Sequence, residues 1–367
     1  MNALNRNALK VAEWWIMRED GSIQCKLCPR ECIIRENGFP GACGVRVRLN
    51  DKFYLAIYGK TSGWALDPIE KKPLFHFYPG SCAFSIGTIG CNLFCIFCQN
   101  WIISQARIKP KTLKFPLRLE DLSPERAVEL ARKNGCSVIA YTYNEPIVWY
   151  EYMLDTAKLA KRNGLKNAMI TNGYINEDPM RELAKYIDAA NVDLKGDENF
   201  YSRLSGAPKA PEAVMRAIEI LIENGVHTEI TILIIPGWND KEDFFRRVAR
   251  WVMDKFGPEK VPVHLSRFYP NYMMRAVPPT PVRIIEKARK ILMEEGLKYV
   301  YIGNVPGHPA EHTYCPNCGK PVIKRNGFWI TDWKLTDDNR CSYCGYKINI
   351  IGKYKQEDSW LRFHMFF

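Results

Sequence analysis

The sequence predicts an α/β protein built around a partial (β/α)6 TIM-like barrel, with small cysteine-rich metal modules at the N- and C-terminal sides. Two observations predict this fold. Between residues 83 and about 302, short apolar runs alternate with amphipathic segments of one to two dozen residues, and most cysteines lie before or after that stretch. Apolar runs separated by helices are typical of parallel strands buried on both faces. Functional groups on such barrels lie where the strands end.

The expected elements follow from this alternation. Strands are expected at 83–88, 137–142, 167–171, 189–193, 229–235 and 261–265, with a last one at 299–302. Helices are expected at 123–134, 146–163, 178–187, 210–224, 240–256 and 279–296. The first helix has a clear start, because Ser123 suits the N-cap and Pro124 the first helical position.

Three regions are expected along the chain. They are a four-cysteine metal-binding region and connector at 1–80, the barrel at 81–302, and a zinc-ribbon or rubredoxin-like module with an apolar tail at 303–367. Within the first region, residues 11–20 are expected to form a short helix or arm. Residues 50–80 are expected to cover the barrel mouth. The apolar tail, residues 360–367, is expected to pack against the protein or contact a partner.

Composition narrows the classes of function. The chain has 367 residues, 47% of them hydrophobic, and a net charge of 52 − 40 = +12. We expect a cytoplasmic protein with no membrane span, because we find neither a long apolar run nor a secretory signal. The positive charge favours an anionic partner, but the basic residues are scattered, which gives nucleic acid little weight. Thirteen cysteines in such a chain indicate metal before disulfides.

Two groups of four cysteines have the spacing of metal ligands. The N-terminal group, spaced C-x2-C-x3-C-x10-C, consists of Cys25, Cys28, Cys32 and Cys43. It suits structural zinc or a second cluster, and the simplest interpretation is that it pins a loop-rich region. The C-terminal group forms two C-x2-C-Gly knuckles and consists of Cys315, Cys318, Cys341 and Cys344. Zinc or iron fits these knuckles, and zinc is favoured. The two single cysteines, Cys82 and Cys136, are expected to be buried small hydrophobic residues.

The most informative motif is Cys91, Cys95 and Cys98, spaced C-x3-C-x2-C after the first expected strand. A cubane iron–sulfur cluster that only carries electrons usually takes four cysteines. Three would leave one iron open to a substrate or cosubstrate. The alternatives are a ferredoxin-like cluster completed by Cys82 or Cys136, or a zinc knot.

Polar residues follow several of the expected strands. Asn144 and Glu145 follow the second strand, where they could bind a cationic amine, although Glu145 could instead cap the next helix. Asp193 and Lys195 alternate to one side of the fourth strand. They could address a zwitterion or form a buried ion pair.

The cysteine loop, with Phe97 before its third cysteine, resembles that of the radical S-adenosylmethionine (SAM) superfamily. This resemblance implies a 4Fe-4S cluster whose unique iron chelates the amino and carboxylate groups of SAM. Reduction would then cleave SAM to methionine and a 5'-deoxyadenosyl radical. It also implies that the backbone of Phe97 contacts the adenine.

The strand ends resemble those of the activases of glycyl-radical enzymes. Asn144 and Glu145 stand where those proteins carry a Gly-Gly-Glu-like motif that holds the amino group of SAM. The resemblance further implies SAM contacts to the carboxylate, ribose and adenosine from Thr171, Asn172, Asp193, Lys195, Thr231, Leu233 and His264.

Across nearly the whole chain, motifs such as Cys43 to Arg46, Gly90 to Asn92 and Asp193 to Gly196 resemble the radical SAM enzymes of the AmmeMemoRadiSam system. The resemblance implies hydrogen abstraction from an unidentified macromolecular substrate, an external low-potential electron donor and Memo-like partner proteins. Two alternatives stay open. One is a multi-centre iron–sulfur electron-transfer protein, and the other is a zinc-ribbon nucleic-acid-binding protein with an inactive barrel.

Overall fold

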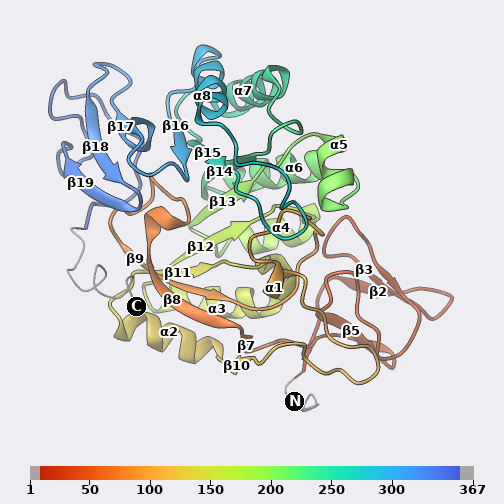
Figure 1. Cartoon of the computed structure of the whole chain (residues 1–367). Helices are drawn as coiled ribbons and strands as arrows, with labels where there is room; N and C mark the ends of the chain where they lie inside the picture. The colour runs from red at the N-terminus through yellow and green to blue at the C-terminus, as the bar shows by residue number, and fades with distance from the viewer. Residues whose placement is uncertain (1–8, 356–367) are drawn as a thin grey trace.

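The computed structural model describes residues 9–355 of the chain (Figure 1). Residues 360–367, the expected apolar tail, lie outside the described residues. The centre of the described part is an eight-stranded sheet in the order β16-β15-β14-β13-β12-β11-β9-β8. Its strands are β8 (Gly63–Pro68), β9 (Cys82–Gly87), β11 (Val138–Tyr141), β12 (Lys166–Thr171), β13 (Ala189–Asp193), β14 (His227–Ile234), β15 (Val263–Arg267) and β16 (Val300–Gly303).

Seven strands of this sheet, β9 and β11 to β16, pair in parallel, and a helix follows each of the first six of them in the described chain. The six helices are α2 (Pro124–Lys133), α3 (Tyr150–Arg162), α4 (Glu177–Ala184), α6 (Ala210–Glu223), α7 (Glu242–Phe256) and α8 (Val282–Glu294). Figure 1 shows them along the outside of the curved sheet. The predicted partial barrel is therefore confirmed. The predicted cap is also confirmed, since Ser123 Oγ accepts a hydrogen bond from Arg126 N at 3.2 Å.

Strand β8 was not predicted. It runs antiparallel to β9 at the edge of the sheet, with Ala65 opposite Ser85. Its sequence contains Gly63, Asp67 and Pro68, which are poor strand formers, but an edge strand needs hydrogen bonds on one side only. Part of the connector therefore extends the sheet instead of only covering the barrel mouth.

The N-terminal region consists of short antiparallel strands. One sheet contains β2 (Trp15–Met17), β3 (Ile23–Cys25) and β4 (Ile33–Ile34), and another contains β1 (Lys10–Val11), β5 (Arg46–Leu49) and β6 (Lys52–Leu55). The short helix considered for residues 11–20 is wrong. Trp14 has a φ of +56°, which a right-handed helix does not allow, and the segment divides into β1 and β2 around it. A further short pair joins β7 (Lys60–Thr61) to β10 (Glu120–Asp121).

The C-terminal region forms a three-stranded sheet of β17 (Thr313–Tyr314), β18 (Pro321–Asn326) and β19 (Trp329–Trp333). It packs on the end of the barrel through a buried cluster that includes Phe75, Tyr299 and Tyr301. The Arg325 guanidinium lies 4.1 Å from the centre of the Phe75 ring. In Figure 1, this sheet and the N-terminal sheets lie at opposite ends of the molecule.

Cys82 and Cys136, which are expected to be buried small hydrophobic residues, are bonded to each other in a disulfide, and Cys136 is buried. Cys82 begins β9 and Cys136 precedes β11, and these neighbouring strands run in parallel with Ala83 beside Val138. The two thiols thus meet although 54 residues separate them. Because each is bonded to the other, neither can complete a cluster at Cys91, Cys95 and Cys98.

The other short helical segments are α1 (Trp101–Ser104), α5 (Glu198–Phe200), a π-helical turn (Tyr201–Ser205) and the 3-10 turns Ile69–Lys71, Pro146–Trp149 and Pro309–Glu311. Among residues 9–355, no helix has both the length and the apolar character needed to cross a membrane.

Candidate functional site

A cavity of about 530 Å³ lies where the parallel strands end. Side chains from the cysteine loop, the ends of strands β11 to β16 and both flanking regions line it. The lining residues are Lys71, Lys72, Cys91, Leu93, Cys95, Phe97, Cys98, Gln99, Asn100, Ser104, Thr142, Tyr143, Asn144, Glu145, Ile170, Thr171, Asn172, Asp193, Lys195, Thr231, Leu233, Ser266, Asn304 and Phe328. The cysteine motif and nearly all the residues assigned to SAM by resemblance therefore face one space.

The loop that carries the three cysteines is fixed from both sides. On one side, Asn144 Oδ1 accepts a hydrogen bond from Thr88 N at 2.9 Å, and Asn144 Nδ2 donates to Gly90 O at 2.9 Å. On the other, Phe94 N donates to Ser205 O at 2.9 Å in the π-helical turn. The amide of Asn144 thus holds the loop, which the sequence motif alone did not indicate.

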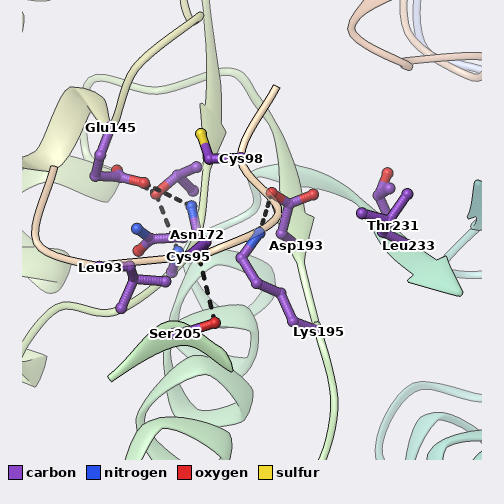
Figure 2. Close-up of polar contacts among 12 residues, drawn as sticks. Leu93, Cys95, Cys98, Glu145, Asn172, Asp193, Lys195, Ser205, Thr231 and Leu233 are labelled. Atoms are coloured by element: carbon purple, nitrogen blue, oxygen red, sulfur yellow. Dashed lines mark hydrogen bonds and ion pairs between the residues drawn. The ribbon is translucent and has the colours of Figure 1, made fainter. Parts of the chain in front are cut away.

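Polar atoms lie beside the thiols. Leu93 N donates to Cys91 Sγ at 3.3 Å. The Ser205 hydroxyl lies 3.2 Å from Cys95 Sγ (Figure 2). Burial raises the pKa of Cys95 to about 11 and also raises the pKa of Cys91 well above its usual value. Such thiolates need a cation beside them, and a bound metal centre supplies it. Buried thiols with a backbone N–H and a hydroxyl group beside them fit an iron–sulfur cluster.

Glu145 is buried beside this loop and has most of its acceptor positions filled. Its Oε1 accepts from Thr171 Oγ1 at 2.7 Å and from Ile147 N at 3.0 Å, while Oε2 accepts from Asn172 N at 2.7 Å. A carboxylate oxygen can accept two hydrogen bonds, so Oε2 has room for one more donor. Burial raises the pKa of Glu145 to about 7, although these donors lower it. A cationic or N–H-donating ligand would favour the ionised form.

Asp193 and Lys195 form an ion pair in the cavity wall, with Lys195 Nζ 2.7 Å from Asp193 Oδ2. Burial lowers the pKa of Lys195, but Asp193 and the Cys95 thiol raise it more, so the ammonium stays charged. The Asp193 side chain is 38% exposed, so the pair is not closed off from a ligand. Figure 2 shows Glu145 and this pair on either side of the cysteine loop, with Thr231 and Leu233 beyond them on β14.

His264 does not line the cavity. It lies on β15 two residues before Ser266, which does line it, and its Nε2 is 2.5 Å from Glu229 Oε2. Its ring also stacks on Tyr301 at 5.2 Å between centres. Glu229 and Tyr301 hold the imidazole away from the cavity lining, and the ribose contact inferred from resemblance stays a prediction.

Sequence reasoning missed a basic group in the lining of the cavity. Lys72 Nζ lies 2.6 Å from Asp67 Oδ2, Lys71 Nζ lies 2.8 Å from Asp67 Oδ1, and Tyr143 donates to the same carboxylate at 2.7 Å. Burial lowers the pKa of Lys72 to about 8 despite Asp67. The sequence feature that could have indicated this group is the pair of adjacent lysines before Pro73, but only the fold shows that they lie at the cavity.

The two four-cysteine groups differ in geometry. In the C-terminal group, Cys315, Cys318, Cys341 and Cys344, the four sulfur atoms lie within 4.8 Å of one another, as one metal ion requires. No three thiols of the N-terminal group meet that condition among the described residues. Those four cysteines instead line a separate small cavity.

Comparisons with known proteins agree with this geometry. The family model described as "Radical SAM superfamily" matches residues 85–248. An uncharacterized protein of Methanocaldococcus jannaschii is 44% identical over 344 residues, which cover 94% of this chain and 100% of that protein. Pyruvate formate-lyase 1-activating enzyme of Escherichia coli K12 is 24% identical over 229 residues, which cover 58% of this chain and 89% of the enzyme.

Solved structures are more distant. A radical SAM methyltransferase from Sphaerobacter thermophilus has a TM-score of 0.47 and 17% identity, and the match covers 81% of this chain and 78% of that one. A domain of pyruvate-formate lyase-activating enzyme from Bacteroides vulgatus has a TM-score of 0.39 and 19% identity, and the match covers 45% of this chain and 98% of that one.

Proposed function

Because the chain belongs to the radical SAM superfamily and is related to pyruvate formate-lyase activating enzymes, we propose that it cleaves SAM reductively and abstracts hydrogen from a further substrate. The carrying observation is that Cys91, Cys95 and Cys98 line one cavity together with Glu145 and the Asp193–Lys195 pair. A 4Fe-4S cluster held by the three thiolates supplies the electron and one open iron.

The residues of this chain bind and orient SAM. The free acceptor position on Glu145 Oε2 suits the amino group of SAM, and the ammonium of Lys195 suits its carboxylate. Asp193, Thr171 and Asn172 complete this polar wall.

The adenosine lies along the other part of the cavity. Thr231 and Leu233 offer a hydroxyl and an apolar surface at successive inward positions of β14. Phe97 is buried against Phe200, with 5.6 Å between ring centres, which fixes the backbone expected to meet the adenine. Excluding water here protects a radical from side reactions.

The substrate enters from the side of Lys71 and Lys72. This wall and the lip formed by Ser266, Asn304 and Phe328 come from segments far apart in the chain, and neither is used by the SAM contacts. The half-exposed ammonium of Lys71 and the polar side chains of the lip suit an acidic or main-chain segment of a macromolecule, such as a glycyl-radical protein or a Memo-like partner. The electron comes from an external low-potential donor.

Anaerobic incubation of the reconstituted protein with SAM and dithionite tests this function. We expect methionine and 5'-deoxyadenosine in equal amounts, and neither product from Cys95→Ala. The control is that Cys95→Ala keeps the circular dichroism spectrum and the C-terminal metal of the wild type. Intact SAM in the presence of a fully loaded cluster would refute the proposal and favour a protein that only transfers electrons.

A further inference from the structure

We infer that Cys25, Cys28, Cys32 and Cys43 hold a second iron–sulfur cluster and that this cluster passes electrons to the site at Cys91, Cys95 and Cys98. Four observations support the inference. The first three concern the N-terminal cysteines and the cavity that they line, and the fourth concerns the wall that this cavity shares with the SAM cavity.

The first observation is the spacing of the thiols. Four thiolates on one zinc or iron ion, at a metal–sulfur distance of about 2.3 Å, lie about 3.8 Å apart. The C-terminal group has this spacing, with 3.6 Å between Cys315 Sγ and Cys344 Sγ and 3.8 Å between Cys318 Sγ and Cys341 Sγ. The N-terminal thiols are spread more widely in the described structure, since no three lie within 4.8 Å of one another. A cubane needs this wider spread because each thiolate binds a different iron.

The second observation is the space that these thiols line. All four thiols line one small cavity, so they can address one buried group. The cavity is mostly apolar otherwise, with Leu27, Phe53 and Val148 in its wall. Together with the wide spacing of the thiols, this common apolar cavity suits an inorganic core bonded to four thiolates.

The third observation is a buried positive charge in the cavity wall. Arg46 is buried, and its Nη1 and Nη2 donate to Glu151 at 2.8 and 2.7 Å. Its Nε has no hydrogen-bond partner in the described structure. An unpaired buried N–H is costly, and an anionic group in the cavity would satisfy it. A cluster with four thiolates is such a group.

The fourth observation is that the two cysteine sites share a wall. Asn92 lines the N-terminal cavity and directly follows Cys91, which lines the SAM cavity. Asn92 Oδ1 accepts from Asn172 Nδ2 at 2.9 Å, and Asn172 also lines the SAM cavity. On the same wall, a Cβ added to Gly90 would lie 2.7 Å from Cys43 O. Gly90, at φ +90°, thus allows the backbones of the two cysteine loops to touch.

This contact gives the second cluster its role, which rests on the proposed function. A low-potential one-electron donor reduces the N-terminal cluster by one electron. That electron then moves to the neighbouring site, and the N-terminal cluster returns to its starting state. One electron enters and one leaves, with no bond made or broken at the N-terminal cysteines.

Acid-labile sulfide distinguishes the two kinds of site, because a single zinc or iron ion binds none. After anaerobic reconstitution with iron and sulfide, we expect about eight sulfides per wild-type chain and about four in either Cys95→Ala or the double variant Cys28→Ala and Cys32→Ala. The reduced electron paramagnetic resonance spectrum of Cys95→Ala should not respond to SAM, whereas that of the double variant should.

One result would overturn the inference. It is that Cys95→Ala is folded and keeps its C-terminal metal, but holds no sulfide and carries zinc on the N-terminal cysteines. The same result in Cys98→Ala would rule out a misfolded loop as the cause.

The electron relay has its own test. Reduction of the SAM-responsive signal by the donor should be at least about tenfold slower in the double variant than in the wild type, and an unchanged rate would refute the relay. Failure of the proposed function would give a different result. The wild type would then leave SAM intact, while Cys95→Ala would still hold the SAM-insensitive cluster on the N-terminal cysteines.

Discussion

Glu145 provides a quantitative prediction, because its ionisation controls its interaction with the amino group of SAM. Burial raises the pKa of this carboxyl to about 7. The raised pKa means that the ionised form is fully present only above pH 7 and is lost as the pH falls. About nine-tenths of the carboxyl is ionised at pH 8 and about one-tenth at pH 6, so the loss of affinity from this group is about tenfold, or about 1.4 kcal/mol.

The matched variant is Glu145→Gln, which keeps the size of the side chain and removes its ionisation. Other groups, including the amine of SAM, also titrate, so the prediction concerns the difference between the two proteins. Between pH 8 and pH 6, the Kd of the wild type for SAM should rise about tenfold more than that of the variant. At pH 8 the variant should bind about ten to a hundred times more weakly, because a charged hydrogen bond is lost.

The assay is a titration of the anaerobically reconstituted protein with SAM, followed by the spectrum of the reduced cluster. Iron and sulfide contents must match between the two proteins at each pH, so that a change in cluster loading does not imitate a change in affinity. Parallel pH profiles for wild type and Glu145→Gln would refute the assignment of Glu145 to the amino group.

Three further predictions concern stability and metal content. Glu151→Ala should lower the free energy of unfolding by about 3–5 kcal/mol, because it removes the carboxylate that pairs with the buried Arg46. Glu129→Ala, in an exposed pair, should cost at most about 1 kcal/mol. Denaturant titration measures both values, and equal effects would contradict the prediction. Asn144→Ala should speed the release of iron to a chelator several-fold. The reason is that the buried Thr88 N–H loses its hydrogen-bond acceptor, at a cost of about 1–3 kcal/mol. An unchanged release rate would show that other contacts hold the cysteine loop. Cys318→Ala should remove one metal ion and no sulfide, measured by elemental analysis, and loss of sulfide would mean that the C-terminal group holds a cluster.

The sequence predicted the barrel well because its signals are local. Alternation of apolar runs with amphipathic segments is set within each element, and Ser123 with Pro124 marks a helix start by backbone chemistry alone. The sequence missed β8 because an edge strand with Gly63 and Pro68 is stabilised by its neighbour and not by its own composition.

Contacts between distant segments could not be predicted in the same way. The Cys82–Cys136 disulfide depends on two strands being neighbours, and Lys72 reaches the cavity only because the connector folds back over it. His264 has the expected position in the motif, but the sequence does not indicate that Glu229 holds its imidazole away from the cavity lining. The three-region division and the individual SAM contacts stay predictions.

The most direct test of the central claim, that one iron at Cys91, Cys95 and Cys98 is open to SAM, is the electron paramagnetic resonance spectrum of the reduced protein with and without SAM. The Cys28→Ala and Cys32→Ala double variant is the best sample, because it retains only the cluster at the barrel mouth. We expect saturating SAM to change the spectrum of that cluster. An identical spectrum at full cluster occupancy would contradict the account.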